Sequence, residues 1–347
     1  MGKINVGIIG FGLSGRYFFS PYIETYEGFH LNAIVTSQSD LVTNEYPNAK
    51  VYSTVKLMLN DTDIDLIIVA SPNYTHFEYT KMALEAGKHV IVEKPFTVTT
   101  TQASKLIAQA KQKNLVLAPF QNRRWDGDFL TVKKIIDSGD LGEIVEFESH
   151  FDRYRPLYDR VQWKNELREG NGVLYDLGPH LIDQALALFG KPHSLFADIK
   201  THRIHGEVDD YFDIHLYYGK MKAILKAGVM VREQGPRFVV HGHKGSFVKY
   251  GLDPQENNLR NGMLPQNPEI GEDTVENYGL IHAEIHNNIR RERVVTTPGN
   301  YMCYFENVYN AINDNEPLQI DAHNALNLID IIEKAYTSST LQKVIQV

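Results

Sequence analysis

The first 120 residues alternate short runs of aliphatic and β-branched residues with segments of helical periodicity. The apolar runs predict strands at Ile4–Ile9, His30–Thr36, Leu66–Ala70, His89–Glu93 and Leu115–Ala118. Two helices are predicted between them, Tyr74–Ala86, which Gly87 ends, and Thr100–Lys113, which opens on threonines that can cap it. This alternation is typical of βαβ units, so we expect a doubly wound parallel sheet.

The pattern changes at about Ile144, where longer segments of period two begin. In Phe212–Tyr218 apolar and polar positions alternate, which predicts a strand with one covered face. Helices are expected at Asp128–Ser138 and Asp176–Phe189, each ending at a glycine. We therefore expect an α/β protein in which residues 1–122 form a dinucleotide-binding Rossmann domain. Residues 123–347 are expected to form an α+β domain with a mostly antiparallel, open sheet.

The last part of the chain contains one long irregular stretch and one amphipathic helix. Gly251–Asn277 is rich in proline and asparagine and is predicted to be an irregular loop. In Asp321–Ser338 the apolar residues recur at helical spacing and Asp321 is a candidate cap, so a helix is expected there.

Composition narrows the class of protein. The chain has 347 residues, a net charge of -8 and 43% hydrophobic residues, which fits an ordinary globular protein and disfavours a nucleic-acid partner. Its one cysteine, Cys303, cannot form an internal disulfide, and the N-terminus carries no signal-peptide pattern. No apolar run approaches the roughly 20 residues of a membrane helix. We expect a cytoplasmic protein with no membrane partner.

A glycine-rich segment follows the first predicted strand and precedes a helical one. It reads Gly10-Phe11-Gly12-Leu13-Ser14-Gly15. Glycines in this context permit a tight turn and let the backbone approach a pyrophosphate at a helix N-terminus. The structural alternative is a turn that binds no ligand, but the strand before the segment and the βαβ pattern after it favour a dinucleotide site.

The end of the second strand bears on which dinucleotide binds. An NAD-preferring fold usually places an acid about 20 residues after the glycines. Here the chain has Thr36, Ser37 and Gln38, whose side chains can donate hydrogen bonds to a 2′-phosphate, with Arg16 as a possible counter-charge. This favours NADP over NAD, although Asp40 is close.

Polar residues also follow the third and fourth of these strands, where ligands bind in an open α/β sheet. The cofactor candidates after the third strand are Ser71, Pro72, Asn73 and His76, and those after the fourth are Glu93 and Lys94. Asn73 could instead cap the following helix, and Lys94 could be a solvated surface lysine. At a strand end beside a nicotinamide site, a catalytic role for Lys94 is favoured.

Asp176 and His180 are four residues apart at the predicted start of a helix, so they can face one way. Oxidation of an alcohol by hydride removal releases a proton, and an imidazole titrates in the range where it can accept one. Asp176 could orient that ring or stabilise the imidazolium. Equally, Asp176 could cap the helix and His180 could be a core histidine. The other histidines show no metal-ligand spacing, so no metal site is expected.

Together these motifs resemble the Gfo/Idh/MocA oxidoreductase family, in order and spacing over nearly the whole chain. The residues that carry the resemblance are Gly10–Gly15, Glu93-Lys94-Pro95 and Gly172–Asp183. The resemblance implies an N-terminal dinucleotide-binding domain and a C-terminal α/β domain whose open sheet often forms oligomer contacts. It also implies that Lys94 and His180 are the catalytic pair and that Asp176 supports His180 and binds the reacting hydroxyl region.

Further segments look like a subgroup that includes the bacterial NADP-dependent scyllo-inositol dehydrogenases. They are Asn122–Asp126, Arg153–Pro156 and Leu174–Asp176. The chain departs from that subgroup at Gln38, where an arginine is expected. Charged and amide groups suit a polyol, and aromatic rings can cover its apolar faces. The substrate-binding candidates are Asn122, Arg123, Trp125, Asp126, Tyr154, Arg155 and Tyr175.

These residues also have structural alternatives, since Arg123 and Arg155 could pair with acids and the aromatic rings could be core. The expected function is an NAD(P)-dependent dehydrogenase of a polyol or sugar CH–OH group, scyllo-inositol first, acting as a homo-oligomer through the C-terminal sheet. The alternatives are a dehydrogenase of an aldose or another sugar, a deoxy-sugar or a tetrapyrrole, and a regulator that binds dinucleotide without turnover.

Overall fold

The computed structural model describes residues 2–157 and 166–347, which form two compact units. Of the described residues, the first unit comprises 2–122, 255–270 and 300–326, and the second comprises 123–157, 166–254, 271–299 and 327–347. The sequence predicts one division after residue 122, with everything beyond it in the second domain. In the structure, residues 255–270 and 300–326 belong to the first unit instead.

Among the described residues, six parallel strands form the sheet of the first unit. The order is β3-β2-β1-β4-β5-β6, the doubly wound arrangement that the alternating pattern predicted. The strands are β1 (Ile4–Ile9), β2 (Phe29–Val35), β3 (Lys50–Tyr52), β4 (Leu66–Val69), β5 (His89–Val92) and β6 (Leu117–Pro119). Because all six run the same way, the loops after their carboxyl ends meet at one edge of the sheet.

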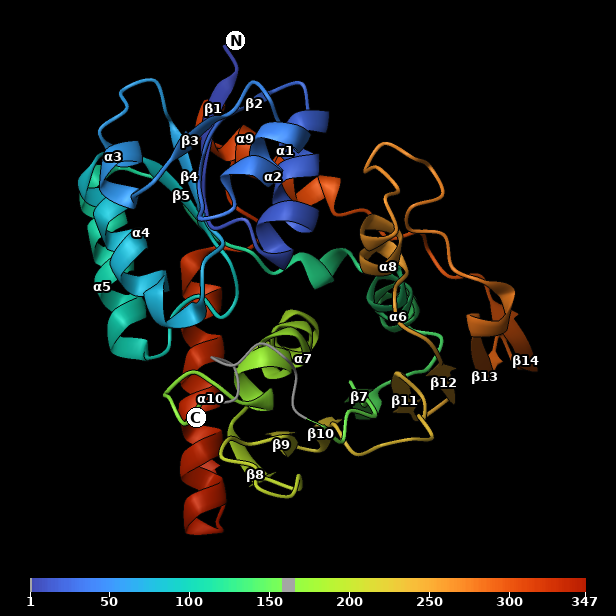
Figure 1. Cartoon of the computed structure of the whole chain (residues 1–347). Helices are drawn as coiled ribbons and strands as arrows, with labels where there is room; N and C mark the ends of the chain where they lie inside the picture. Colours follow the sequence, from blue (N-terminus) through green and yellow to red (C-terminus); the bar gives the residue numbers. More distant parts are fainter. Residues whose placement is uncertain (1, 158–165) are drawn as a thin grey trace. The chain divides into compact units, whose positions relative to one another are not determined.

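Helices cover both faces of this sheet (Figure 1). On one side, α3 (Val55–Leu59), α4 (His76–Glu85) and α5 (Thr100–Lys113) bury aliphatic side chains against the strands. Thr99 caps α5 by accepting a hydrogen bond from the Gln102 N–H, as the threonine run predicted. On the other side lie α1 (Ser20–Thr25) and α9 (Met302–Asn313). The helical turn Ser14–Phe19 and α2 (Ser39–Glu45) complete the connections after β1 and β2.

Aromatic packing explains why residues 300–326 belong to the first unit. The ring of Phe305 in α9 stacks on Tyr22 of α1, with 4.9 Å between the ring centroids. Tyr304 packs edge-on against Phe120 and donates a hydrogen bond to the Ala118 carbonyl at 3.3 Å. Burial of such large rings contributes strongly to a core, so this late segment is part of the early domain.

The second unit is built on a mostly antiparallel sheet, as expected. Over its described part, nine strands pair in the order β14-β13-β12-β11-β7-β10-β9-β8-β15, and only β7 and β10 pair in parallel. They are β7 (Ile144–His150), β8 (Ser194–Lys200), β9 (Tyr211–Tyr218), β10 (Met221–Gly228), β11 (Phe238–Gly242), β12 (Gly245–Lys249), β13 (Gly279–Ile285), β14 (Asn288–Val294) and β15 (Ile345–Gln346).

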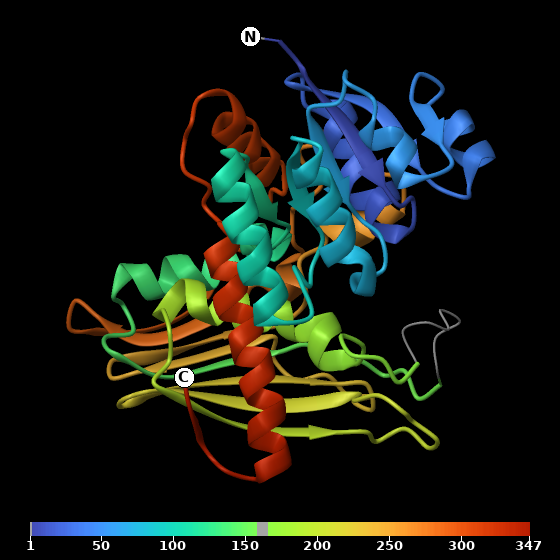
Figure 2. The ribbon, with the colours of Figure 1, turned by 90° about the vertical axis from the view of Figure 1, so that its left-hand side faces the viewer.

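One face of this sheet is covered by helices (Figure 2). Helices α6 (Gly127–Ser138) and α7 (Val173–Phe189) lie against it, and α10 (Ala322–Leu341) follows near the end of the chain. In β9, Phe212, Ile214 and Leu216 are fully buried, while Asp213 and His215 on the opposite face are half-buried. This is the alternation that the sequence predicted.

Two local predictions were wrong. Gly251–Asn277 is not wholly irregular, because it contains α8 (Gln255–Arg260), whose Gln255 is fully buried and accepts a hydrogen bond from the Tyr301 N–H. Tertiary contacts of this kind stabilise a short helix that local propensity does not reveal. Helix α7 begins at Val173 instead of Asp176, so Asp176 lies in its first turn and Gly172 occupies the N-cap position. In the part of the chain that the structure describes, no helix is long and apolar enough to cross a membrane.

Candidate active site

The glycine-rich loop after β1 has the geometry of a dinucleotide cradle. Gly10 has a φ of +99°, and a Cβ atom there would lie 2.7 Å from the Ala70 carbonyl oxygen. A Cβ on Gly15 would lie 2.2 Å from the Gly10 carbonyl oxygen. Gly12 differs, because it is exposed and a Cβ would meet nothing within 4 Å. Gly10 and Gly15 therefore serve the turn itself, and Gly12 leaves open space beside the backbone, where we expect a pyrophosphate to approach.

The turn after β2 is tied to this loop. The Gln38 Nε2 donates to the Phe11 carbonyl at 3.2 Å, and the Thr36 hydroxyl accepts from the Gln38 N–H at 3.0 Å. Ser37 is exposed beside them. Arg16, the expected counter-charge for a 2′-phosphate, forms a two-pronged ion pair with Glu45 of α2.

The loops after β4 and β5 are joined by a buried histidine. His76 is 1% exposed, and its two ring nitrogens lie 2.7 Å from the Pro95 carbonyl oxygen and 2.9 Å from that of Ser71. Burial lowers the pKa of His76, and the contacts with the two carbonyl oxygens act in the opposite direction. His76 thus holds the loop that carries Glu93 and half-buried Lys94, and its contribution to cofactor binding is expected to be indirect. Pro72 precedes the 3-10 turn Asn73–Thr75, in which Asn73 is buried.

Helix α7 of the second unit carries the expected proton-handling pair. Asp176 is half-buried in the first turn, and His180 is 5% exposed one turn later. Residues four apart lie one above the other on a helix, and Asp183 and Gln184 continue the same stripe. Asp176 and His180 are therefore brought together on one helix face, while Lys94 belongs to the sheet edge of the first unit.

Asp209 anchors the start of α7. Its backbone carbonyl accepts from the Val173 N–H and its carboxylate from the Leu174 N–H, both at 2.8 Å. The Tyr336 hydroxyl of α10 donates to the same carboxylate at 2.7 Å, and the ring of Tyr336 stacks on Tyr175. Asp209 satisfies these helix donors, because Gly172 at the cap position has no side chain to do so.

Burial raises the pKa of Asp209 to about 6 from its usual 3.8. A raised folded-state pKa means that the folded protein binds the proton more tightly, so stability falls as pH rises from about 4 to about 6. In Asp209→Asn the amide keeps an acceptor oxygen and loses the titration. We expect the wild-type advantage in unfolding free energy to be larger at pH 4 than at pH 7 by on the order of 2 kcal/mol. Urea unfolding of both proteins measures this, and parallel pH curves would contradict it.

The polyhydroxyl-binding candidates begin on the segment Asn122–Trp125, which is fastened to α7 one turn beyond His180. Gln184 Nε2 donates to the Arg123 carbonyl at 2.9 Å. Arg124 binds the carboxylate of Asp183 with two hydrogen bonds of 2.7 and 2.8 Å. The fork of an arginine on a carboxylate fixes orientation as well as distance. This segment and the helix bearing His180 are therefore held together as one frame.

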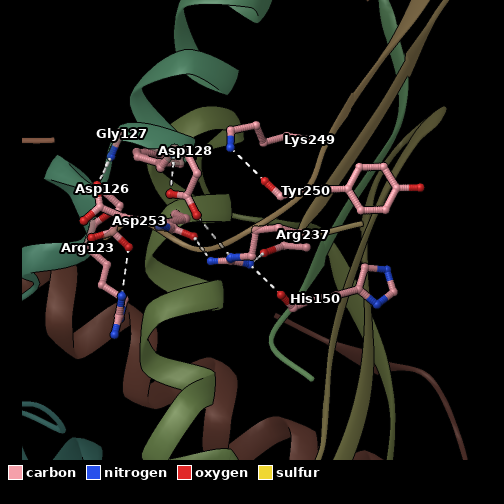
Figure 3. A network of polar contacts seen from close by, with 12 residues as sticks. Arg123, Asp126, Gly127, Asp128, His150, Arg237, Lys249, Tyr250 and Asp253 are labelled. Carbon is pink, nitrogen blue, oxygen red and sulfur yellow. Dashed lines mark hydrogen bonds and ion pairs between the residues drawn. The ribbon is translucent and has the colours of Figure 1, made fainter. Parts of the chain in front are cut away.

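A buried arginine supports that frame from the sheet (Figure 3). Arg237 is 4% exposed and donates to the Gln184 Oε1 at 3.1 Å, the Ser149 hydroxyl at 2.6 Å and the His150 carbonyl at 2.9 Å. Its Nε lies 3.5 Å from the carboxylate of Asp128 in α6. Burial lowers the pKa of Arg237, but a guanidinium stays charged at any physiological pH. Removal of either charged side chain would leave the other charge buried without this partner. Substitutions at either position are therefore expected to be costly.

The structure separates the substrate candidates into a buried and an exposed group. Asp126 is fully buried and its carboxylate accepts from Arg123 at 3.0 Å, so we expect Asp126 to hold Arg123 in place. Tyr154 and Arg155 are exposed, and the guanidinium of Arg232 lies 3.9 Å from the centre of the Tyr154 ring. The remaining candidates, each at most 8% exposed, are Asn122, Trp125 and Tyr175.

Sequence reasoning missed several supporting residues. Asp209 and Tyr336 lie far from α7 along the chain, and Arg237 looks like any other charged residue in a strand pattern. Glu45 sits at the end of a short helix and carries no motif. Only a three-dimensional arrangement reveals such partners. Among residues 2–157 and 166–347, no cluster of His, Cys, Asp and Glu side chains could hold a metal ion.

Models of two protein domains match this chain in sequence. Residues 4–120 match the NAD-binding Rossmann fold of the Gfo/Idh/MocA oxidoreductase family, and residues 133–347 match its C-terminal α/β domain. The chain belongs to the Gfo/Idh/MocA oxidoreductase family. It is therefore an NAD(P)-dependent oxidoreductase, as the family resemblance implied.

Members of the family with named activities match this chain to different extents. The scyllo-inositol 2-dehydrogenase (NADP(+)) IolW of Bacillus subtilis is 38% identical over 99% of this chain and 95% of its own length. A D-glucoside 3-dehydrogenase of Escherichia coli is 32% identical over 54% of this chain and 55% of its own length. The crystal structure of an oxidoreductase from Bacillus cereus superposes with a TM-score of 0.92, at 35% identity and 99% coverage of both chains. These two relatives are named as dehydrogenases of a cyclitol and of a glucoside.

Proposed function

We propose that this chain is an NADP-preferring polyol dehydrogenase that transfers hydride between the nicotinamide and a ring carbon of scyllo-inositol, in either direction. The named activity of a relative that matches nearly the whole chain supports the cyclitol. The single observation that carries the chemistry is the α7 stripe, in which Asp176 and His180 lie one turn apart and the next turn binds the segment after Asn122.

In this proposal, the glycine-rich loop after β1 would hold the dinucleotide, which when bound would supply the hydride chemistry at the carbinol or carbonyl carbon. His180 accepts the hydroxyl proton as the alcohol becomes a carbonyl, and Asp176 stabilises the imidazolium that results. The Lys94 ammonium donates a hydrogen bond to the reacting oxygen, which stabilises the negative charge that develops there. Arg123, Asn122 and Arg155 bind the other hydroxyls of the polyol.

The proposed cofactor preference rests on the turn after β2. Thr36, Ser37 and Gln38 stand where an acid would hold the ribose of NAD, and a carboxylate there would repel a 2′-phosphate. Hydrogen-bond donors at this position can bind the ribose of either cofactor. The positive charge of Arg16 favours NADP, because only NADP carries a 2′-phosphate that can pair with it.

Steady-state kinetics with a panel of alcohols test the substrate and the cofactor together. We expect kcat/KM to be highest for scyllo-inositol with NADP+, ahead of myo-inositol, glucose and a glucoside, each at matched concentration. A misplaced hydroxyl leaves a buried polar group unpaired, so a stereoisomer should lose a factor of about 10 or more. A larger kcat/KM for an aldose or a glucoside would reject the cyclitol and keep the oxidoreductase. A larger kcat/KM with NAD+ would reject the cofactor preference.

We also propose a role for the second unit, self-association of the chain and a cytoplasmic location. The second unit binds the substrate and, through the half-buried polar face of its sheet, a second copy of the chain. Side chains such as Asp213 and His215 on that face lie 3.0 Å apart, so the face offers polar groups for self-association. Cys303 is a free thiol, which suits the reducing cytoplasm.

A further inference from the structure

We propose that Glu45 limits the affinity of this protein for NADP+ by occupying the guanidinium of Arg16. The 2′-phosphate binds only when Arg16 exchanges the Glu45 carboxylate for the phosphate. This inference rests on the proposed function, because it concerns the choice between the two dinucleotides at the same site.

Arg16 stands where a cation can serve the adenosine end of a dinucleotide. Its backbone N–H donates to the Gly12 carbonyl at 3.0 Å, so it lies one turn beyond the glycine that leaves room for the pyrophosphate. The turn after β2, where the ribose hydroxyls lie in this fold, is hydrogen-bonded to the same loop through Gln38 and Phe11. In residues 10–16 and 36–40 together, Arg16 is the single cationic residue.

Glu45 holds Arg16 in the arrangement that a phosphate would need. The Arg16 Nε donates to Oε2 at 3.1 Å, and Nη2 donates to Oε1 of the same carboxylate. Arginine binds phosphate with the same parallel pair of donors, so both anions compete for one edge of the guanidinium. The hydrogen bond to Glu45 also raises the pKa of Arg16, as expected of a paired cation.

The exposure of this pair allows the exchange. The side chains of Arg16 and Glu45 are 36% and 29% exposed, so water can replace either partner. Breaking an exposed pair costs a factor of about 2 to 5 in an equilibrium constant, whereas an arginine–phosphate pair contributes more. NAD+ has a hydroxyl at the 2′ position and does not need the guanidinium. Glu45 therefore weakens NADP+ binding and leaves NAD+ binding unchanged.

Calorimetric titration of NADP+, NAD+ and 2′,5′-ADP into the full chain and its variants tests this role of Glu45. Glu45→Gln should lower the Kd of NADP+ and of 2′,5′-ADP by about 2- to 5-fold and change that of NAD+ by less than about 1.5-fold. Arg16→Gln should raise the Kd of NADP+ by about 10-fold or more, and adding Glu45→Gln to it should have no further effect. Glu85→Gln is the matched control, because Glu85 also pairs with a cation and its removal changes the net charge equally.

Any one of four results would overturn the inference. A weaker NADP+ complex in Glu45→Gln would mean that Glu45 orients Arg16 for the phosphate. An equal gain for NAD+, or a gain in Glu85→Gln, would mean a general effect of charge. If Glu45→Gln still strengthens NADP+ binding in the Arg16→Gln background, Glu45 does not act by competing for Arg16. A wild-type protein that binds NADP+ no more tightly than NAD+ would reject the proposed cofactor preference, while the selective gain in Glu45→Gln would still support the role of Glu45.

Discussion

Replacement of Lys94 by alanine is expected to reduce kcat for alcohol oxidation by about 100-fold or more and to change the Kd of NADP+ by less than about 3-fold. Lys94 follows β5 at the sheet edge where the glycine-rich loop also lies, and its loop is held by buried His76. An ammonium that polarises the reacting oxygen acts mainly in the transition state, so its loss lowers kcat more than cofactor affinity.

Stopped-flow reduction of NADP+ and a separate titration of the cofactor distinguish these two effects. Lys81→Ala is the control, because Lys81 pairs with Glu85 on the surface of α4 and carries the same charge. Near-normal turnover in Lys94→Ala would mean that Lys94 is a solvated lysine with no catalytic role. A large loss of cofactor affinity would make it a binding residue instead.

Replacement of His180 by alanine is expected to remove most of the activity, by a factor of about 100 to 10,000. In the wild type, kcat/KM for alcohol oxidation should rise with pH through a group that titrates between about 6 and 8, because only a neutral imidazole can accept the proton. In His180→Ala this rise should disappear. Asp176→Asn should lower activity with the fold intact, since the amide keeps the shape and loses the charge.

The test measures kcat/KM against pH for the wild type and three variants. These are His180→Ala, Asp176→Asn and the exposed-histidine control His243→Ala. If kcat/KM of the wild type does not change with pH and His180→Ala is active, His180 is a structural core histidine and not the proton acceptor. Circular dichroism of each variant checks that lost activity does not reflect lost structure.

The pattern of apolar residues predicted the type of both sheets, because periodicity follows directly from which face of an element is buried, but it missed the short edge strand β3. The limits of Thr100–Lys113 and the alternation in β9 matched the structure for this reason. The return of α9 to the first unit was not predictable, since it depends on contacts between Phe305 and Tyr22 that are distant in sequence. The start of α7 was missed because its cap is supplied by Asp209 across a gap of many residues.

The candidate site was predicted unevenly for the same physical reason. Strand ends and helix faces can be located from sequence, so the edge with Gly10 and Lys94 and the pair of Asp176 and His180 were placed on the expected elements. Ion pairs between separate elements leave no local trace. The two-pronged contacts of Arg16 with Glu45 and of Arg124 with Asp183 therefore appeared only in three dimensions.

Isotope transfer tests the central claim most directly. The purified protein is incubated with NADP+ and scyllo-inositol that carries deuterium on every ring carbon, and the reduced cofactor is analysed by mass spectrometry. The proposed hydride transfer predicts NADPH with one added deuterium at the nicotinamide C4, formed together with an inosose. Tight binding of NADP+ with no reduction by any cyclitol, sugar or glucoside would contradict the account and indicate a regulator that binds dinucleotide without turnover.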